Sequence, residues 1–117
     1  MAKDRSNDTA QVDIKLKVNG SSIELNPFAG AFISSTVLGM LSNLRGMENN
    51  GALESLQMDV CGGNVSVKAN GVEIGMNLFV ADFISGATRG MVSPLRGVDK
   101  DVENIELVLL FPLTNQP

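Results

Sequence analysis

The sequence predicts an α+β fold in which a ββαβ unit is duplicated in tandem, with about six strands and two helices in two layers. The sheet is expected to be mainly antiparallel, with the helices on one face. Three observations lead to this prediction: an internal repeat, segments in which apolar and polar residues alternate, and an apolar segment of helical periodicity in each copy.

The internal repeat defines the expected organisation of the chain. Shifting the sequence by 51 positions aligns residues 17–47 with residues 68–98 without a gap, and 15 of the 31 pairs are identical. Random pairing would give about two identities. We therefore expect one repeat at residues 12–61 and another at residues 62–113, after a disordered polar tail at residues 1–11. Residues 1–117 are then expected to form one pseudo-symmetric domain.

Each repeat opens with a segment that is expected to form a hairpin. Apolar and polar residues alternate over residues 12–18 and again over residues 65–69, which indicates strands with one buried face. An Asn-Gly pair follows in both copies, Asn19 with Gly20 and Asn70 with Gly71. Asn-Gly is a strong hairpin signal because both residues tolerate the positive φ of a type I′ turn.

A helix is predicted after each hairpin. Asn26 and Asn77 are expected N-caps, because an asparagine oxygen can accept a hydrogen bond from a free N–H of the first turn. Apolar residues at positions 28, 29, 32, 33, 37, 40, 41 and 44 form a broad helical stripe. The helices are expected to stop at the Arg-Gly pairs of residues 45–46 and 96–97. Pro94 should kink or end the second helix near residues 91–93.

Residues 53–60 and 102–111 are the expected third strands. A right-handed crossover would make each third strand parallel to the second, which gives the order 2-1-3 in a repeat. The two third strands would then join the repeats into one sheet. The alternative is that residues 53–60 pair with residues 65–69 across a short turn at residues 61–64. Val108 and Leu110 make the second face of the last strand apolar, so this strand is expected to be covered on both faces.

The composition argues against several classes of function. The net charge of −4 disfavours a nucleic-acid partner. One cysteine, Cys61, and no histidine exclude a disulfide within the chain and a conventional zinc site. The polar first residues do not form a signal peptide, and the apolar run at residues 107–113 is too short to cross a membrane. We therefore expect a cytoplasmic protein without a membrane partner, cofactor, metal site or catalytic residues.

Two sets of repeated residues are candidates for function. Arg45 and Arg96, joined by Arg89, are expected to be charges near the helix C-termini, with contacts to an anion or a partner as the functional alternative. The other set is a ridge of small residues, expected to pack between the helices or against the sheet, or alternatively to line a groove where a ligand meets helix backbone. The ridge consists of Ser35, Gly39, Ser42 and Gly46 in the first copy and Gly86, Gly90, Ser93 and Gly97 in the second.

Four short motifs carry a resemblance to known proteins. They are Val-Asn-Gly at residues 18–20, Asn-Pro-Phe at residues 26–28, Thr-Val-Leu-Gly-Met at residues 36–40 and Ser-Asn-Leu-Arg-Gly at residues 42–46. On these motifs each copy resembles a group of small uncharacterised archaeal and bacterial proteins about one unit long. The resemblance implies that a one-unit relative dimerises and that this chain is the fused version. It implies no activity. Asp82 and Pro94 depart from the pattern of the first copy, so the halves are not expected to be equivalent.

The function expected from these observations is that of a non-catalytic binding or assembly module. The expected partner is a protein, either a second copy of this chain or another one. A homodimer could form through the apolar last strand. The alternative is a regulatory protein that binds a small ligand or an anion between the two repeats.

Overall fold

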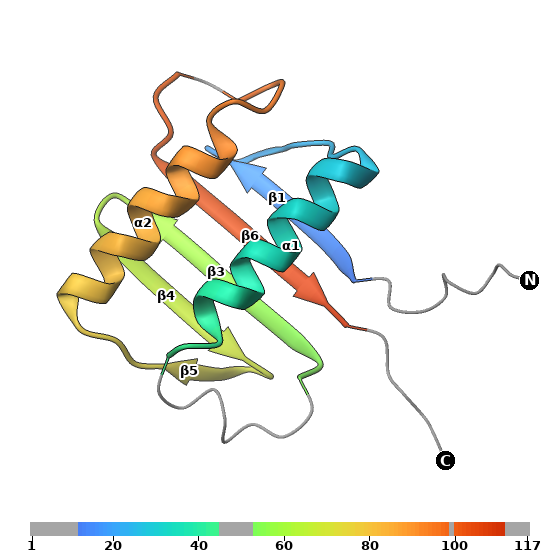
Figure 1. Cartoon of the computed structure of the whole chain (residues 1–117). Coiled ribbons are helices and arrows are strands. Elements are labelled where there is room, and N and C mark those ends of the chain that lie inside the picture. Colours follow the sequence, from blue (N-terminus) through green and yellow to red (C-terminus); the bar gives the residue numbers. More distant parts are fainter. Residues whose placement is uncertain (1–11, 45–52, 99, 112–117) are drawn as a thin grey trace, which may run out of the picture.

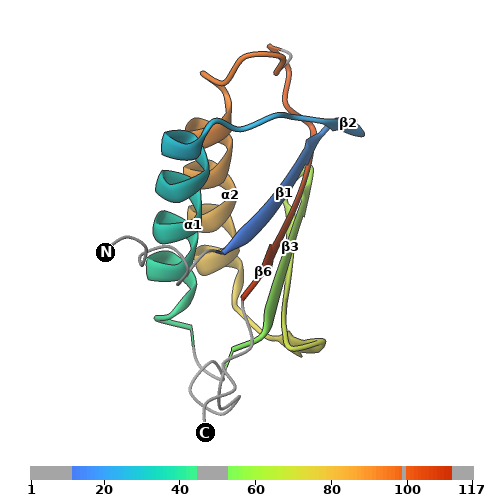
Figure 2. The same cartoon turned by 90° about the vertical axis from the view of Figure 1, so that its right-hand side faces the viewer.

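The computed structural model of the chain describes residues 12–44, 53–98 and 100–111, and within them it has one antiparallel sheet with two helices on one face (Figures 1 and 2). The predicted α+β class with mainly antiparallel strands is therefore confirmed. The elements in chain order are β1 (Asp13–Val18), β2 (Ser21–Ser22), α1 (Pro27–Leu41), β3 (Ser55–Cys61), β4 (Asn64–Ala69), β5 (Val72–Ile74), α2 (Leu78–Val92) and β6 (Asn104–Leu110).

The strand order is β2-β1-β6-β3-β4-β5, so the last strand of each half lies beside the hairpin of the other half. The two third strands do join the halves, as expected. The predicted order 2-1-3 within a repeat is wrong, and so is the predicted parallel third strand. The alternative pairing of β3 with β4 is the one observed, because Gly62, at φ +60, closes a tight turn between Cys61 and Asn64. A short turn costs less loop entropy than a crossover connection.

The Asn-Gly turns have the predicted conformation. Asn19 and Gly20 have φ angles of 51° and 84°, and Asn70 and Gly71 have 52° and 81°. All four residues thus lie in the left-handed region that a type I′ turn requires.

The side chains of these two asparagines also bind the neighbouring strand. The Oδ1 atom of Asn19 accepts hydrogen bonds from the N–H groups of Glu103, at 2.8 Å, and Asn104, at 3.0 Å. The Oδ1 atom of Asn70 accepts from the N–H groups of Glu54, at 2.7 Å, and Ser55, at 3.1 Å. Each asparagine therefore fixes the start of a third strand that belongs to the other half of the chain.

Both helices begin where predicted, and α1 ends earlier than predicted. The Oδ1 atom of Asn26 accepts from the N–H of Ala29 at 2.7 Å, and that of Asn77 accepts from the N–H of Val80 at 2.9 Å. Both caps are confirmed. The helices end at residues 41 and 92, so the Arg-Gly stops expected at residues 45–46 and 96–97 are wrong, and the end expected for the second helix near residues 91–93 is confirmed. Gly97 does have a positive φ of 85°, but it lies in the segment after α2, while Gly46 lies outside the described residues.

Pro94 has the predicted position relative to the helix end, since α2 stops at residue 92. However, α1 ends at the equivalent residue 41 and has Asn43 where α2 has proline. The proline is therefore compatible with the helix end and is not needed to produce it.

The core lies between the helices and one face of the sheet and is almost entirely aliphatic. Its largest fully buried side chains are Ile33, Leu41, Leu56, Met58, Ile105, Leu107 and Leu109. The opposite face of β6 is open, because Val108 is half-buried and Leu110 is 41% exposed. The prediction that the last strand is covered on both faces is therefore wrong. The two helices lie on the same side of the sheet (Figure 2).

Neither α1 nor α2 is long enough to cross a membrane, and the structure has no other helix among the residues it describes.

The contribution of the Asn19 side-chain hydrogen bonds to stability can be measured separately from that of the turn conformation. We expect Asn19→Ala to lower the free energy of unfolding by about 2–3 kcal/mol, since it loses the side-chain hydrogen bonds and since alanine tolerates positive φ less well than asparagine. Asn19→Gly keeps the backbone conformation and should lose only about 1–2 kcal/mol. Urea denaturation of both variants measures the two contributions. Equal losses would show that the side-chain hydrogen bonds contribute everything.

Thr88 offers a second test, because its Oγ1 atom is buried and has no hydrogen-bond partner. The equivalent residue of α1 is the fully buried Val37. We expect Thr88→Val to raise the free energy of unfolding by about 1–2 kcal/mol, because the unpaired hydroxyl is removed without a change of shape. The exposed Thr36 is the control, and Thr36→Val should change stability by less than about 0.5 kcal/mol. A destabilised Thr88→Val variant would contradict the expectation.

Candidate interaction surface

Each helix presents a stripe of residues on the side that faces away from the sheet. In α1 the buried residues are Gly30, Ile33, Ser34, Val37 and Leu41. At 3.6 residues per turn, the positions opposite to these are 28, 32, 35 and 39. The equivalent positions in α2 are 79, 83, 86 and 90. We call these residues together the helix face: Phe28, Phe32, Ser35 and Gly39 of α1 with Phe79, Phe83, Gly86 and Gly90 of α2.

The first half of each stripe is aromatic and exposed. Phe28 and Phe32 are 77% and 53% exposed, and Phe79 and Phe83 are 69% and 67% exposed. The ring centroids are 6.1 Å apart in the α1 pair and 5.2 Å apart in the α2 pair. Four of the five phenylalanines of the chain thus lie on the surface in pairs. Aromatic side chains usually dominate the burial in a core or an interface, so this arrangement requires an explanation.

The second half of each stripe is small and open. Gly39 and Gly90 are exposed, and a Cβ atom built on either would meet nothing within 4 Å. The expected packing of this ridge between the helices or against the sheet is therefore wrong for these two glycines. The small residues that do face the sheet are Gly30 and Ser34 of α1 and Ala81 and Ser85 of α2. Gly90 and Ser93 of the ridge also line a shallow pocket, together with Arg89 and residues 100–103.

The helix face carries almost no charge. No residue of α1 is ionisable, and α2 contains only the exposed Asp82 and the half-buried Arg89. The open face of the sheet is the polar side of the molecule. Exposed ionisable residues there include Asp13, Lys15, Lys17, Lys68, Glu73 and Glu106. The usual arrangement, in which the outer side of a surface helix is polar, is therefore reversed.

The three arginines predicted to contact an anion or a partner differ in their surroundings. The guanidinium of Arg89 donates to the carbonyl oxygens of Val102 and Gly62 and, through Nε at 3.2 Å, to the Oγ atom of Ser85. It ties α2 to the turn between β3 and β4 and to the segment before β6. Arg96 is exposed, in the segment after α2, and Arg45 lies outside the described residues. Because the donors of Arg89 already bind carbonyl groups, its principal role is structural.

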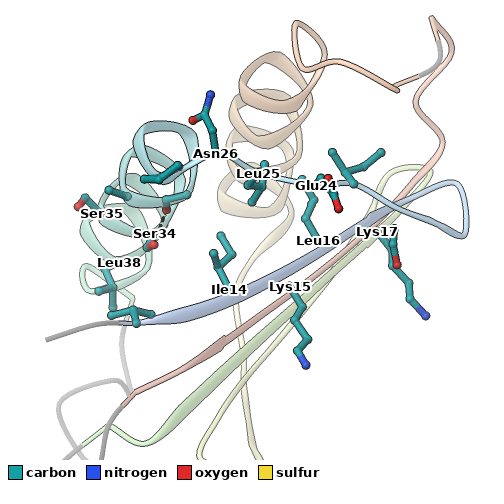
Figure 3. A pocket seen from close by; sticks show the side chains of 16 residues that line it. Ile14, Lys15, Leu16, Lys17, Glu24, Leu25, Asn26, Ser34, Ser35 and Leu38 are labelled. Atoms are coloured by element: carbon teal, nitrogen blue, oxygen red, sulfur yellow. Dashed lines mark hydrogen bonds between the residues drawn. The ribbon is translucent and has the colours of Figure 1, made fainter. Parts of the chain in front are cut away.

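A groove lies between α1 and β1, with a volume of about 670 Å³ (Figure 3). Ile14, Leu16, Leu25 and Leu38 give it an apolar wall. The lysines of β1, at positions 15 and 17, point away from α1 (Figure 3). Ser34 donates to the carbonyl oxygen of residue 30 at 2.6 Å, so its hydroxyl proton is already used. The lining also includes the polar residues Ser22, Glu24, Asn26 and Ser35, so the groove has polar as well as apolar walls. The described part of the chain also contains no group of three or more Asp, Glu or Cys residues placed to hold a metal ion.

The exposed phenylalanines are identical in the two repeats, but the apolar periodicity placed them in the same broad stripe as the core residues. The width of that stripe is the signal that could have separated them. Apolar residues at 28 and 32 lie on the opposite side of the helix from those at 33, 37 and 41, so one sheet cannot cover both sets.

Comparison with known proteins gives no match to a family model, to a curated protein or to a solved structure.

The structural role of Arg89 can be tested against Arg96. We expect Arg89→Lys to lower the free energy of unfolding by about 1–2 kcal/mol, because one ammonium group cannot reach the three acceptors that the planar guanidinium reaches. Arg96→Lys should change it by less than about 0.5 kcal/mol. Thermal or urea unfolding measures both. Equal stability of the two variants would contradict the role assigned to Arg89.

Proposed function

We propose that this chain is a non-catalytic binding and assembly module that binds a protein partner through the helix face. The observation that supports this most is the pair of exposed phenylalanines at the start of each outward stripe, Phe28 with Phe32 and Phe79 with Phe83.

The exposed aromatic area is divided between the two pairs. With about 200 Å² for a whole phenylalanine side chain, each pair exposes about 250 Å². The largest apolar patch of a typical monomer is about 300–600 Å² and often has a function, so each pair approaches the lower end of that range. Each buried phenylalanine contributes about 1.5–3 kcal/mol. A partner that covers both pairs therefore gains a substantial free energy of binding.

The chemistry of the surface favours a protein partner over the other classes. A nucleic acid needs many basic residues, and the helix face has none. An anion-binding regulator, the alternative function, would use the arginines, and the guanidinium of Arg89 is already bound to carbonyl groups. An apolar surface without charge is complementary to another apolar protein surface.

Hydroxyl-radical footprinting tests whether the helix face is covered in the native setting. The oxidation rates of the four phenylalanines are measured by mass spectrometry in an extract of the source cells and in the purified chain at high dilution. We expect at least about a threefold slower oxidation in the extract, because a bound partner excludes water from an interface core.

Val72 on β5 and Leu110 on β6 are matched controls, since both are exposed and lie off the helix face. Their oxidation rates should be equal in the two samples. Equal rates for all four phenylalanines would contradict the proposed binding surface. A thermal-shift screen with phosphate, nucleotides and carboxylates tests the alternative, and a clear rise of the melting temperature with one of them would favour the anion-binding regulator.

A further inference from the structure

We propose that the partner on the helix face is a second copy of this chain, bound face to face so that the helices of both copies lie between two outer sheets. This inference rests on the proposed function, because it takes the helix face to be the binding surface and names its occupant.

The first argument is the distribution of large and small residues along the stripes. In both helices the phenylalanines occupy the N-terminal half, and small residues such as Gly39 and Gly90 occupy the C-terminal half. The two helices run in opposite directions across the sheet (Figure 1). The aromatic end of each stripe is therefore beside the small end of the other.

This distribution makes the surface complementary to itself. One arrangement has a twofold axis in the interface plane, parallel to the helices. It places α1 of the second copy antiparallel on α2 of the first copy. The other arrangement has a twofold axis in the same plane, perpendicular to the helices. It places α1 of the second copy antiparallel on α1 of the first copy. In both arrangements an aromatic half faces a small half, so rings meet glycine and serine rather than other rings. Small residues allow the close approach that ridges-into-grooves packing needs.

The second argument is area. A specific interface buries about 800 Å² on each partner. The four phenylalanines supply about 500 Å² of this, at about 200 Å² for a whole side chain, and the exposed small residues of the helix face, such as Ser35 and Gly39, contribute further area. The aromatic pairs lie at opposite ends of the helix layer, so a single short peptide covers only one of them. A second copy has the same dimensions as the layer and covers both.

The third argument is charge. A twofold dimer brings each charge of its interface near a copy of itself, so charged stripes would repel. The helix face has no charged residue, and Asp82 is placed at the side of the stripe rather than on it. The face can therefore meet its own copy without a like-charge penalty.

The homodimer expected from the sequence used the last strand, and the structure directs the contact elsewhere. Both edges of β6 are hydrogen-bonded, to β1 and to β3, so no strand can be added to it. Its open face offers Val108 and Leu110 among charged neighbours, which is a much smaller apolar area than the helix face.

Sedimentation equilibrium of the purified full chain over a wide range of concentration tests the inference. We expect a reversible monomer–dimer equilibrium. Phe28→Ser and Phe79→Ser should each raise the dissociation constant about tenfold or more, because both lie in the interface core. Val72→Ser and Leu110→Ser are matched controls and should leave it unchanged.

Gly90→Leu is the decisive second variant, because it separates folding from binding. Its side chain meets open space in the monomer, so the melting temperature of the dilute chain should not fall. The same side chain fills the surface that receives the partner's rings, so the dissociation constant should rise about tenfold or more. A Gly90→Leu variant that dimerises normally would overturn the arrangement.

The remaining outcomes are also decisive. A chain that stays monomeric at the highest concentration overturns the inference, and so does a dimer weakened by Leu110→Ser and not by Phe79→Ser. If the purified chain is monomeric while its phenylalanines are protected in the extract, the second copy is excluded and the proposed binding surface stands with another protein as its occupant. If the phenylalanines are unprotected as well, both proposals fail.

Discussion

The antiparallel pairing of β3 with β6 at the centre of the sheet is the contact on which the other elements depend. Seven residues of β6 pair with β3, and six of them pair with β1 on the other side. Each central strand thus joins the hairpin of the opposite half. Because both helices pack on the face that these strands build, the position of the helix face follows from this exchange. Asn19 and Asn70 reinforce it, since each fixes the first residues of the strand that arrives from the other half.

The exchange makes the two halves energetically inseparable. Without β6, strand β1 of the first hairpin loses its neighbour in the sheet. Without β3, strand β4 of the second hairpin loses its neighbour. The buried core draws on both, since Leu56 and Met58 of β3 and Ile105 and Leu107 of β6 are fully buried on the face of the sheet that the two helices cover. Dividing the chain would expose these side chains and the backbone groups of two central strands, and each exposed apolar side chain costs about 1.5–3 kcal/mol. The chain therefore folds as one cooperative unit.

The features that the sequence predicted well are local ones. The Asn-Gly turns and the asparagine caps depend on φ preferences and on hydrogen bonds within three or four residues, so their chemistry is readable from a short segment. The strand order depends on which of two partners a third strand chooses, and Gly62 and Gly63 decided this in favour of the tight turn. The surface was mistaken for core because a pattern records that Phe28 and Phe79 are apolar, and only the arrangement of layers shows which side of a helix the sheet can cover.

The edges of the sheet have a further consequence. The outermost strands, β2 and β5, are two and three residues long, whereas the central strands have seven. Each of them covers only part of its neighbour, residues 17–18 of β1 and residues 67–69 of β4, so each edge of the sheet is stepped. A stepped edge is a poorer template for continued strand addition than one long straight strand. Growth into fibres by the sheet is thereby disfavoured at both edges, and the proposed association uses the helix side instead. The proposed contact lies on one side of the molecule and is related to itself by a twofold axis, so the assembly would be complete with two copies.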